Sequence, residues 1–134
     1  SDGEKLLRHI LEPYKGKLVL LDVWGTWCIP CKMALAHSKE EFERLAPYDV
    51  VYLYMANSSP EESWKNIIKL YDLVGDNIAH YRLPAAQQSA IENYLNVHSF
   101  PSYRLFDKEG NLVDVKVDAR QLDKLERIIK KLSK

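Results

Sequence analysis

The sequence has few of the features that mark disulfide-stapled, membrane-spanning or nucleic-acid-binding proteins. It has two cysteines among 134 residues, too few for the disulfide framework of a small secreted scaffold. Its longest apolar stretch, Leu18–Trp24, is interrupted by Asp22 and is far shorter than the roughly 20 residues that cross a bilayer. Nineteen basic residues balance nineteen acidic ones with no basic stripe, which argues against nucleic acid as a partner and against direct membrane insertion.

The remaining composition is that of an ordinary folded domain. Hydrophobic residues make up 46% and charged residues 28%, and a chain of this length can bury one core. The chain starts with Ser1-Asp2-Gly3 and has no initiator methionine. We therefore expect residues 1–134 to be a single domain cut from a longer protein, in which a targeting segment need not be visible.

Apolar periodicity alternates between the helical and the extended pattern, which predicts an α/β fold with a central mixed sheet flanked by helices. Residues 103–106 and 112–117 are expected to form a terminal β-hairpin, and 78–83 is ambiguous between strand and loop. Ser59 with Glu62, and Asp118 with Gln121, are predicted to cap the helices that follow them. The predicted helices span about residues 4–12, 28–45, 60–74, 84–95 and 119–132, and the other predicted strands span 18–24 and 50–55.

The two cysteines form a Cys28-x-x-Cys31 motif between a predicted buried strand and a predicted helix. Unpaired N–H groups and the helix dipole at such a position favour a thiolate, which is the form that attacks disulfides. Cys31 follows one helical turn later, close enough to bridge to Cys28, and Pro30 is tolerated in the first turn because its missing N–H costs little there. A catalytic dithiol is therefore the preferred interpretation.

Two other interpretations of the cysteines stay open. The pair could be half of a zinc site, although zinc prefers four ligands and no second cysteine pair exists. The cysteines could also be inert core residues. A further alternative concerns Asp22, which is either a buried acid able to exchange protons with Cys31 or an ordinary acid at a solvated strand end.

The segment Trp-Gly-Thr-Trp-Cys-Ile-Pro-Cys-Lys at residues 24–32 resembles the active-site segment of thioredoxin-fold proteins. Its sequence is most similar to that of the TlpA/ResA-like branch. Phe100-Pro101, followed by the predicted strand 103–106, resembles the cis-proline loop of that family. The resemblance covers nearly the whole chain. It implies a thioredoxin-like fold with an extra helical insertion before the cis-proline loop.

The resemblance also implies a function. Cys28 is expected to attack the substrate disulfide, and Cys31 is expected to resolve the mixed disulfide that forms. The substrate is expected to contact five residues: Trp27, Ile29, Pro30, Phe100 and Pro101. Such a protein exchanges electrons with protein disulfides without a cofactor or metal, and an upstream thiol donor reduces it again. Relatives of this branch are typically extracytoplasmic reductants, periplasmic or membrane-tethered. A non-catalytic binding module with a structural disulfide is the alternative function.

The sequence departs from the TlpA/ResA-like pattern at several positions. Ala34 and Ala36 stand where many relatives carry a glutamate and a helix-kinking proline, and Asp22 stands where many carry asparagine. Asp22 lies six residues before Cys28, as a buried acid does in plain thioredoxins. The helix predicted over 4–12 also replaces the usual strand pair. We therefore expect a proton relay of the thioredoxin type, through Asp22.

Overall fold

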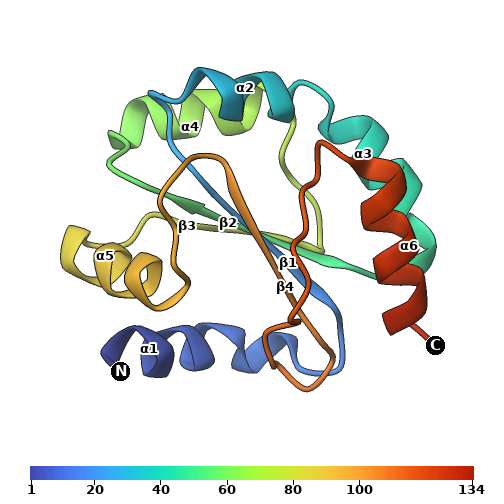
Figure 1. Cartoon of the computed structure of the whole chain (residues 1–134). Helices are drawn as coiled ribbons and strands as arrows, with labels where there is room; N and C mark the ends of the chain where they lie inside the picture. The colour runs from blue at the N-terminus through green and yellow to red at the C-terminus, as the bar shows by residue number, and fades with distance from the viewer.

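The computed structural model describes residues 1–134 and has a four-stranded sheet with helices on both faces (Figure 1). The strands are β1 (Val19–Trp24), β2 (Val51–Ala56), β3 (Ile78–Tyr81) and β4 (Ser102–Phe106), in the order β3-β2-β1-β4. β1, β2 and β3 are parallel and β4 is antiparallel to β1. The predicted α/β class with a mixed sheet is therefore confirmed, and residues 78–81 form a strand.

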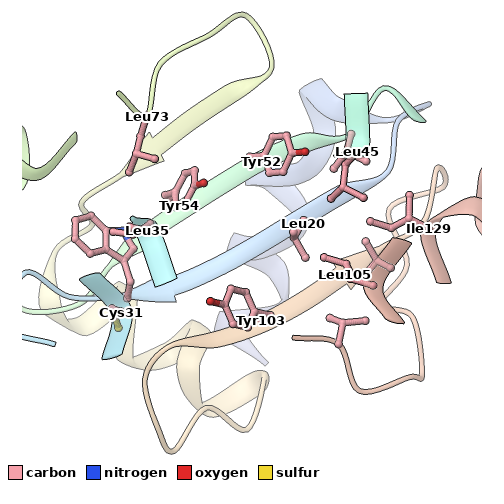
Figure 2. Close-up of a cluster of buried hydrophobic side chains, with 14 of the residues drawn as sticks. Leu20, Cys31, Leu35, Leu45, Tyr52, Tyr54, Leu73, Tyr103, Leu105 and Ile129 are labelled. Carbon is pink, nitrogen blue, oxygen red and sulfur yellow. The ribbon is translucent and has the colours of Figure 1, made fainter. Parts of the chain in front are cut away.

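Six α-helices cover the sheet, and they divide between its two faces (Figure 1). Helices α1 and α5 pack on one face, against the β1 side chains Val19, Leu21 and Val23. Helices α2, α3, α4 and α6 cover the other face, where Leu20 and Trp24 enter a larger core (Figure 2). The helices are α1 (Asp2–Leu11), α2 (Ile29–Leu35), α3 (Ser38–Leu45), α4 (Glu61–Leu70), α5 (Ala85–Tyr94) and α6 (Leu122–Leu132). No helix has both the length and the apolar character needed to cross a membrane.

The single long helix predicted over 28–45 is wrong, because the chain breaks between α2 and α3. His37 has φ −104° and ψ 12°, outside the helical values. Ser38 is buried, and its hydroxyl donates a hydrogen bond of 2.6 Å to the carbonyl of Leu35. Serine competes in this way for backbone groups that a continuous helix would use. The break turns α3 into a new direction (Figure 1).

The two predicted side-chain caps are also wrong. The Ser59 hydroxyl accepts a bond from the amide of Thr26 at 3.0 Å and donates to the carbonyl of Asn57 at 2.8 Å, so Pro60 takes the cap position of α4. The Asp118 carboxylate instead binds the amide and the guanidinium of Arg120. In both places a tertiary or local polar partner outcompetes the helix end.

The predicted terminal hairpin is also wrong, for a reason of packing. The second hairpin strand shrinks to one bridge between Phe106 and Leu112, because the chain leaves the sheet edge and buries Val117 in the core. On α5, Tyr94 is exposed and its hydroxyl donates to Glu4 of α1 at 3.2 Å, whereas Gln88 is buried.

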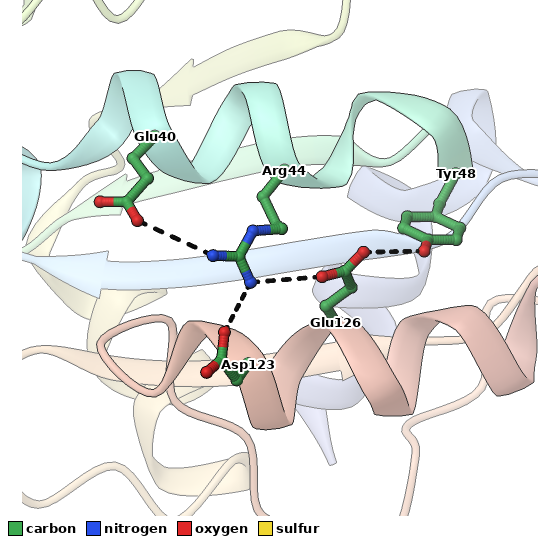
Figure 3. Close-up of polar contacts among 5 residues, drawn as sticks. All are labelled: Glu40, Arg44, Tyr48, Asp123 and Glu126. Carbon is green, nitrogen blue, oxygen red and sulfur yellow. Dashed lines mark hydrogen bonds and ion pairs between the residues drawn. The ribbon is translucent and has the colours of Figure 1, made fainter.

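An ion-pair network fixes α3 against α6 (Figure 3). Arg44 of α3 contacts Asp123 at 2.6 Å and Glu126 at 3.3 Å. Tyr48 donates to the other oxygen of Glu126 at 2.9 Å. Single surface pairs contribute little to stability, but a network that shares one arginine limits how α3 can move relative to α6.

The break between α2 and α3 makes a testable prediction about stability. Ser38→Ala removes a donor from the buried carbonyl of Leu35 and is expected to lower the free energy of unfolding by about 1–3 kcal/mol. Ser133→Ala is the matched control, because Ser133 makes the same bond to the carbonyl three residues earlier, at 2.8 Å, but on the surface. Urea unfolding of the two variants measures the difference, and equal losses would contradict a special role for the buried bond.

Candidate active site

Cys28 and Cys31 lie where β1 ends and α2 begins. Cys28 is the N-cap of α2, and its Sγ accepts the amide N–H of Cys31 at 3.2 Å. The two residues form a disulfide with their Cα atoms 5.2 Å apart. Cys28 is 4% exposed and Cys31 only 1%. The predicted strand-to-helix position of the pair is confirmed, and Cys31 is the more deeply buried cysteine.

The loop that leads to Cys28 is shaped around the indole of Trp27. This side chain is 51% exposed, and its Nε1 donates to the carbonyl of Asn57 at 2.9 Å. A Cβ at Gly25 would collide with the indole, so only glycine allows the ring to fold back over the loop. The indole therefore lies at the surface beside the cysteines, as the resemblance implies.

Polar residues after β2 hold this loop, and they were not predicted as part of the site. Ser59 accepts the Thr26 amide, and Asn57 accepts the indole of Trp27. Glu92 of α5 accepts a bond from the Asn57 side chain at 2.7 Å. The signal in the sequence is a polar run directly after a buried strand, because the carboxyl ends of neighbouring parallel strands meet at one edge of the sheet.

The Phe100-Pro101 segment reaches the same edge. Its peptide bond is cis, as expected, and Pro101 is buried. The ring of Phe100 packs edge-on against Trp27 with centroids 5.2 Å apart. These two aromatic residues, which are far apart in sequence, are thus brought together beside Cys28.

Apolar side chains on α2 extend this surface. Ile29 is 67% exposed and Met33, one turn later, is 66% exposed, while Pro30 is also exposed. Met33 was not predicted as a site residue. It could have been found because residues four apart share one face of a helix, and Cys31 and Leu35 occupy the buried face.

Asp22 is buried in the middle of the sheet, which excludes the solvated strand end. It pairs in register with Tyr54 on β2 and Tyr103 on β4, and it is 9% exposed. Its Oδ1 atom has no hydrogen-bond partner. Burial raises the pKa of Asp22 to about 7, with Arg120 lowering it and Asp118 raising it.

Asp22 faces the helix that carries Cys31. It lines a pocket of about 270 Å³ together with Ala34 and Leu35 of α2. Glu41 of α3 and Arg120 line the same pocket. Because Ala34 has a short side chain, the carboxyl groups available there come from the sheet and from α3 rather than from α2.

Residues that could bind a metal ion do not gather at the site. No group of three or more histidine, cysteine, aspartate or glutamate residues is arranged to hold a metal ion. His98 contacts the side chain of Asn96 at 3.2 Å on the surface, and His80 contacts the carbonyl of Leu73.

Known proteins are similar to this chain in sequence and in fold. Residues 16–112 match the family described as thioredoxin-like. The chain is 28% identical over 125 residues to the thiol–disulfide oxidoreductase ResA of Bacillus cereus, covering 92% of this chain and 68% of that protein. It is 29% identical over 132 residues to the thioredoxin-like protein YneN of Bacillus subtilis, covering 93% and 69% respectively.

Solved structures agree with the sequence comparison. The exposed lipoprotein thioredoxin Etrx1 of Streptococcus pneumoniae superposes with a TM-score of 0.68 at 28% identity, over 91% of this chain and 90% of that one. The thioredoxin domain of a Bacteroides vulgatus thiol–disulfide oxidoreductase superposes with a TM-score of 0.72 at 21% identity, over 92% and 84%. The chain therefore belongs to the thioredoxin-like family, and its Cys-x-x-Cys pair is that of a thiol–disulfide oxidoreductase.

Proposed function

We propose that this protein reduces disulfides in other proteins, with Cys28 as the nucleophile and Cys31 as the resolving residue. The observation that carries the proposal is the position of the pair. Cys28 caps α2 and is the less buried cysteine, while Cys31 lies in the core on the side of the sheet where Asp22 meets α2. Such a site separates an attacking sulfur from a resolving sulfur that needs a proton acceptor.

The reaction proceeds in two displacements. The Cys28 thiolate attacks one sulfur of the substrate disulfide, the substrate S–S bond breaks, and the first substrate sulfur leaves as a thiolate. Cys31 then loses its proton and attacks Cys28 Sγ in the mixed disulfide, so that the second substrate sulfur leaves. The substrate has gained two electrons, and the Cys28–Cys31 disulfide has formed.

Asp22 is proposed as the acceptor of the Cys31 proton. Burial raises its pKa to about 7, so that near neutral pH it is available both as carboxylate and as acid. A carboxyl group with an ordinary pKa would hold such a proton poorly. The unpaired Oδ1 atom leaves one side of the carboxylate free for that exchange.

The charges around the pair support the reducing direction. The one hydrogen bond to Cys28 Sγ comes from the amide of Cys31, and no lysine, arginine or histidine side chain bonds to it. Strong oxidants of this fold are oxidising because their reduced thiolate is stabilised. Here the nearby buried groups are acids, which disfavour an additional negative charge. A protein of this kind needs an upstream thiol donor to reduce it again.

The substrate is proposed to lie as an extended segment across Trp27, Ile29, Pro30, Phe100 and Pro101. The exposed apolar area of Trp27 and Ile29 beside Cys28 suits a partially unfolded protein chain. An extracytoplasmic, periplasmic or membrane-tethered location is proposed because the Streptococcus pneumoniae relative is described as an exposed lipoprotein.

The direction of electron flow is tested by the reduction potential. We expect equilibration with glutathione and with thioredoxin to give a value near thioredoxin's, about −270 mV, rather than near about −120 mV, the value of a strong oxidant. A value near the second would reverse the proposed direction. A disulfide that neither partner reduces would instead favour the non-catalytic binding module.

The roles of the two cysteines are tested by trapping. Cys31→Ser is expected to accumulate mixed disulfides with substrate proteins, since resolution is blocked, whereas Cys28→Ser should accumulate none. In the reduced protein Cys28 should also be alkylated first, because Cys31 is the more buried sulfur. Mass spectrometry of the alkylated peptides measures the order, and faster labelling of Cys31 would exchange the two roles.

Asp22 is tested through its effect on stability and on resolution. The unfolded carboxyl ionises near pH 4 and the folded one near 7. The stability associated with the protonated form is therefore fully present below about pH 4 and is lost as the pH rises to about 7. The asparagine of Asp22→Asn does not titrate. The free energy of unfolding of this variant should therefore rise relative to that of the wild type across this window, by roughly 1.4 kcal/mol per unit of pKa difference.

Urea unfolding of the oxidised proteins at several pH values measures this gain, with Asp76→Asn as a control at an exposed aspartate. In stopped-flow reduction, Asp22→Asn should slow the resolution of the mixed disulfide more than its formation. Parallel stability curves and equal rates for Asp22→Asn and the wild type would make Asp22 a structural residue only.

A further inference from the structure

The pocket that Asp22 lines together with α2 contains a second carboxyl group, Glu41, to which the two displacements assign no role. Glu41 is half-buried on α3 and lines the same pocket of about 270 Å³ as Asp22. A pocket of this size can hold several water molecules. Because Asp22 is almost fully buried while Glu41 is only half-buried, Glu41 is the member of the pair nearer to solvent.

No cation neutralises Glu41. Its carboxylate forms no ion pair or hydrogen bond, whereas the Arg120 guanidinium is committed to Asp118 through contacts of 2.9 and 3.0 Å. The tyrosine hydroxyls that feel its charge from β2 and β4 are neutral at physiological pH, because burial raises their pKa values. The titratable and charged groups around the Asp22–Glu41 pair are Tyr52, Tyr54, Tyr103, Asp118, Arg120, His37 and Glu40.

The two carboxyl groups influence one another. Burial, followed by the negative charge of Asp22, raises the pKa of Glu41 to about 8. Two acids in one desolvated pocket lose their protons in sequence, and the two steps belong to the pair. Between the two steps the pair carries a single negative charge that the two groups share.

We propose that Asp22 and Glu41 form one acid pair that moves the Cys31 proton to solvent, with Glu41 as the end of the pair that meets water. The inference rests on the proposed reduction of disulfides. When the Cys28–Cys31 bond forms, the singly charged pair accepts the proton of Cys31 at Asp22 and becomes neutral. Glu41 then releases a proton to water in the pocket, which restores the single charge. A proton passes from Asp22 to Glu41 through that water, so that Asp22 is a carboxylate again. The proton transfers within the acid pair involve no oxidation or reduction.

The coupling is tested by titrating the carboxyl carbons with NMR in the oxidised protein. The wild type should show two linked steps, and Asp22→Asn should lower the pKa of Glu41 because the neighbouring charge is gone. Glu43→Gln is the matched control, since Glu43 is an exposed glutamate on the same helix, and it should change neither step. A Glu41 titration that is identical in the wild type and in Asp22→Asn would overturn the pair, even if Glu41→Gln failed to fold.

The relay is tested by the pH profile of mixed-disulfide resolution. Glu41→Gln should be several-fold slower than the wild type near pH 7 and should follow one ionisation in place of two, while Glu43→Gln should match the wild type. Added imidazole, a small proton carrier, should restore the rate of Glu41→Gln in proportion to its concentration and leave the wild type unchanged.

The two proposals fail differently. Equal profiles for Glu41→Gln and Glu43→Gln, in a protein that otherwise reduces disulfides normally, would overturn the relay alone. A wild-type protein that exchanges no disulfide would overturn the proposed function, and the relay with it.

Discussion

Strand β1 is buried on both faces, and the positions of its side chains determine the site. Val19, Leu21 and Val23 enter the core beneath α1 and α5, while Leu20 and Trp24 enter the larger core on the opposite face. Alternation then requires Asp22 to point into that larger core. The same strand ends where Cys28 begins α2, so one element places both the dithiol and the acid on the side of the sheet that α2 covers.

The second constraint is the break after α2. A continuous helix would carry residues 38–45 straight on from α2, whereas the Ser38 bond to Leu35 lets the chain turn. The Arg44 network then holds α3 against α6 (Figure 3). As a result Glu41, ten residues after Cys31 in the sequence, returns to the pocket that contains Asp22. A local hydrogen bond and a surface network thus bring Glu41 into the same pocket as Asp22.

The parts of the structure that periodicity controls could be predicted from the sequence. The order of strands and helices and the position of the Cys28–Cys31 pair follow from apolar runs and from the turn residues between them, and the cis bond at Pro101 follows from the family resemblance. Apart from the terminal hairpin, the failures occurred where a polar side chain had a choice of partner. Ser59 binds Thr26 rather than its own helix, and such a choice depends on which strand ends lie side by side. The pairing of Glu41 with Asp22 in one pocket could not be predicted for a similar reason, since the two residues lie on different elements.

The carboxyl groups of Asp22 and Glu41 are costly to the folded state, and that cost bears on their proposed role. A buried carboxyl group without a partner destabilises the protein whenever it is ionised, and here Asp22 lacks a hydrogen bond to Oδ1 while Glu41 lacks a cation. A purely structural core would be more stable with apolar residues at both positions. Arg120 lies close enough to lower the pKa of Asp22 but is held by Asp118, so it moderates the penalty without removing it. The arrangement keeps both carboxyl groups titrating near neutral pH, and a fully neutralised or fully solvated pair would not do so.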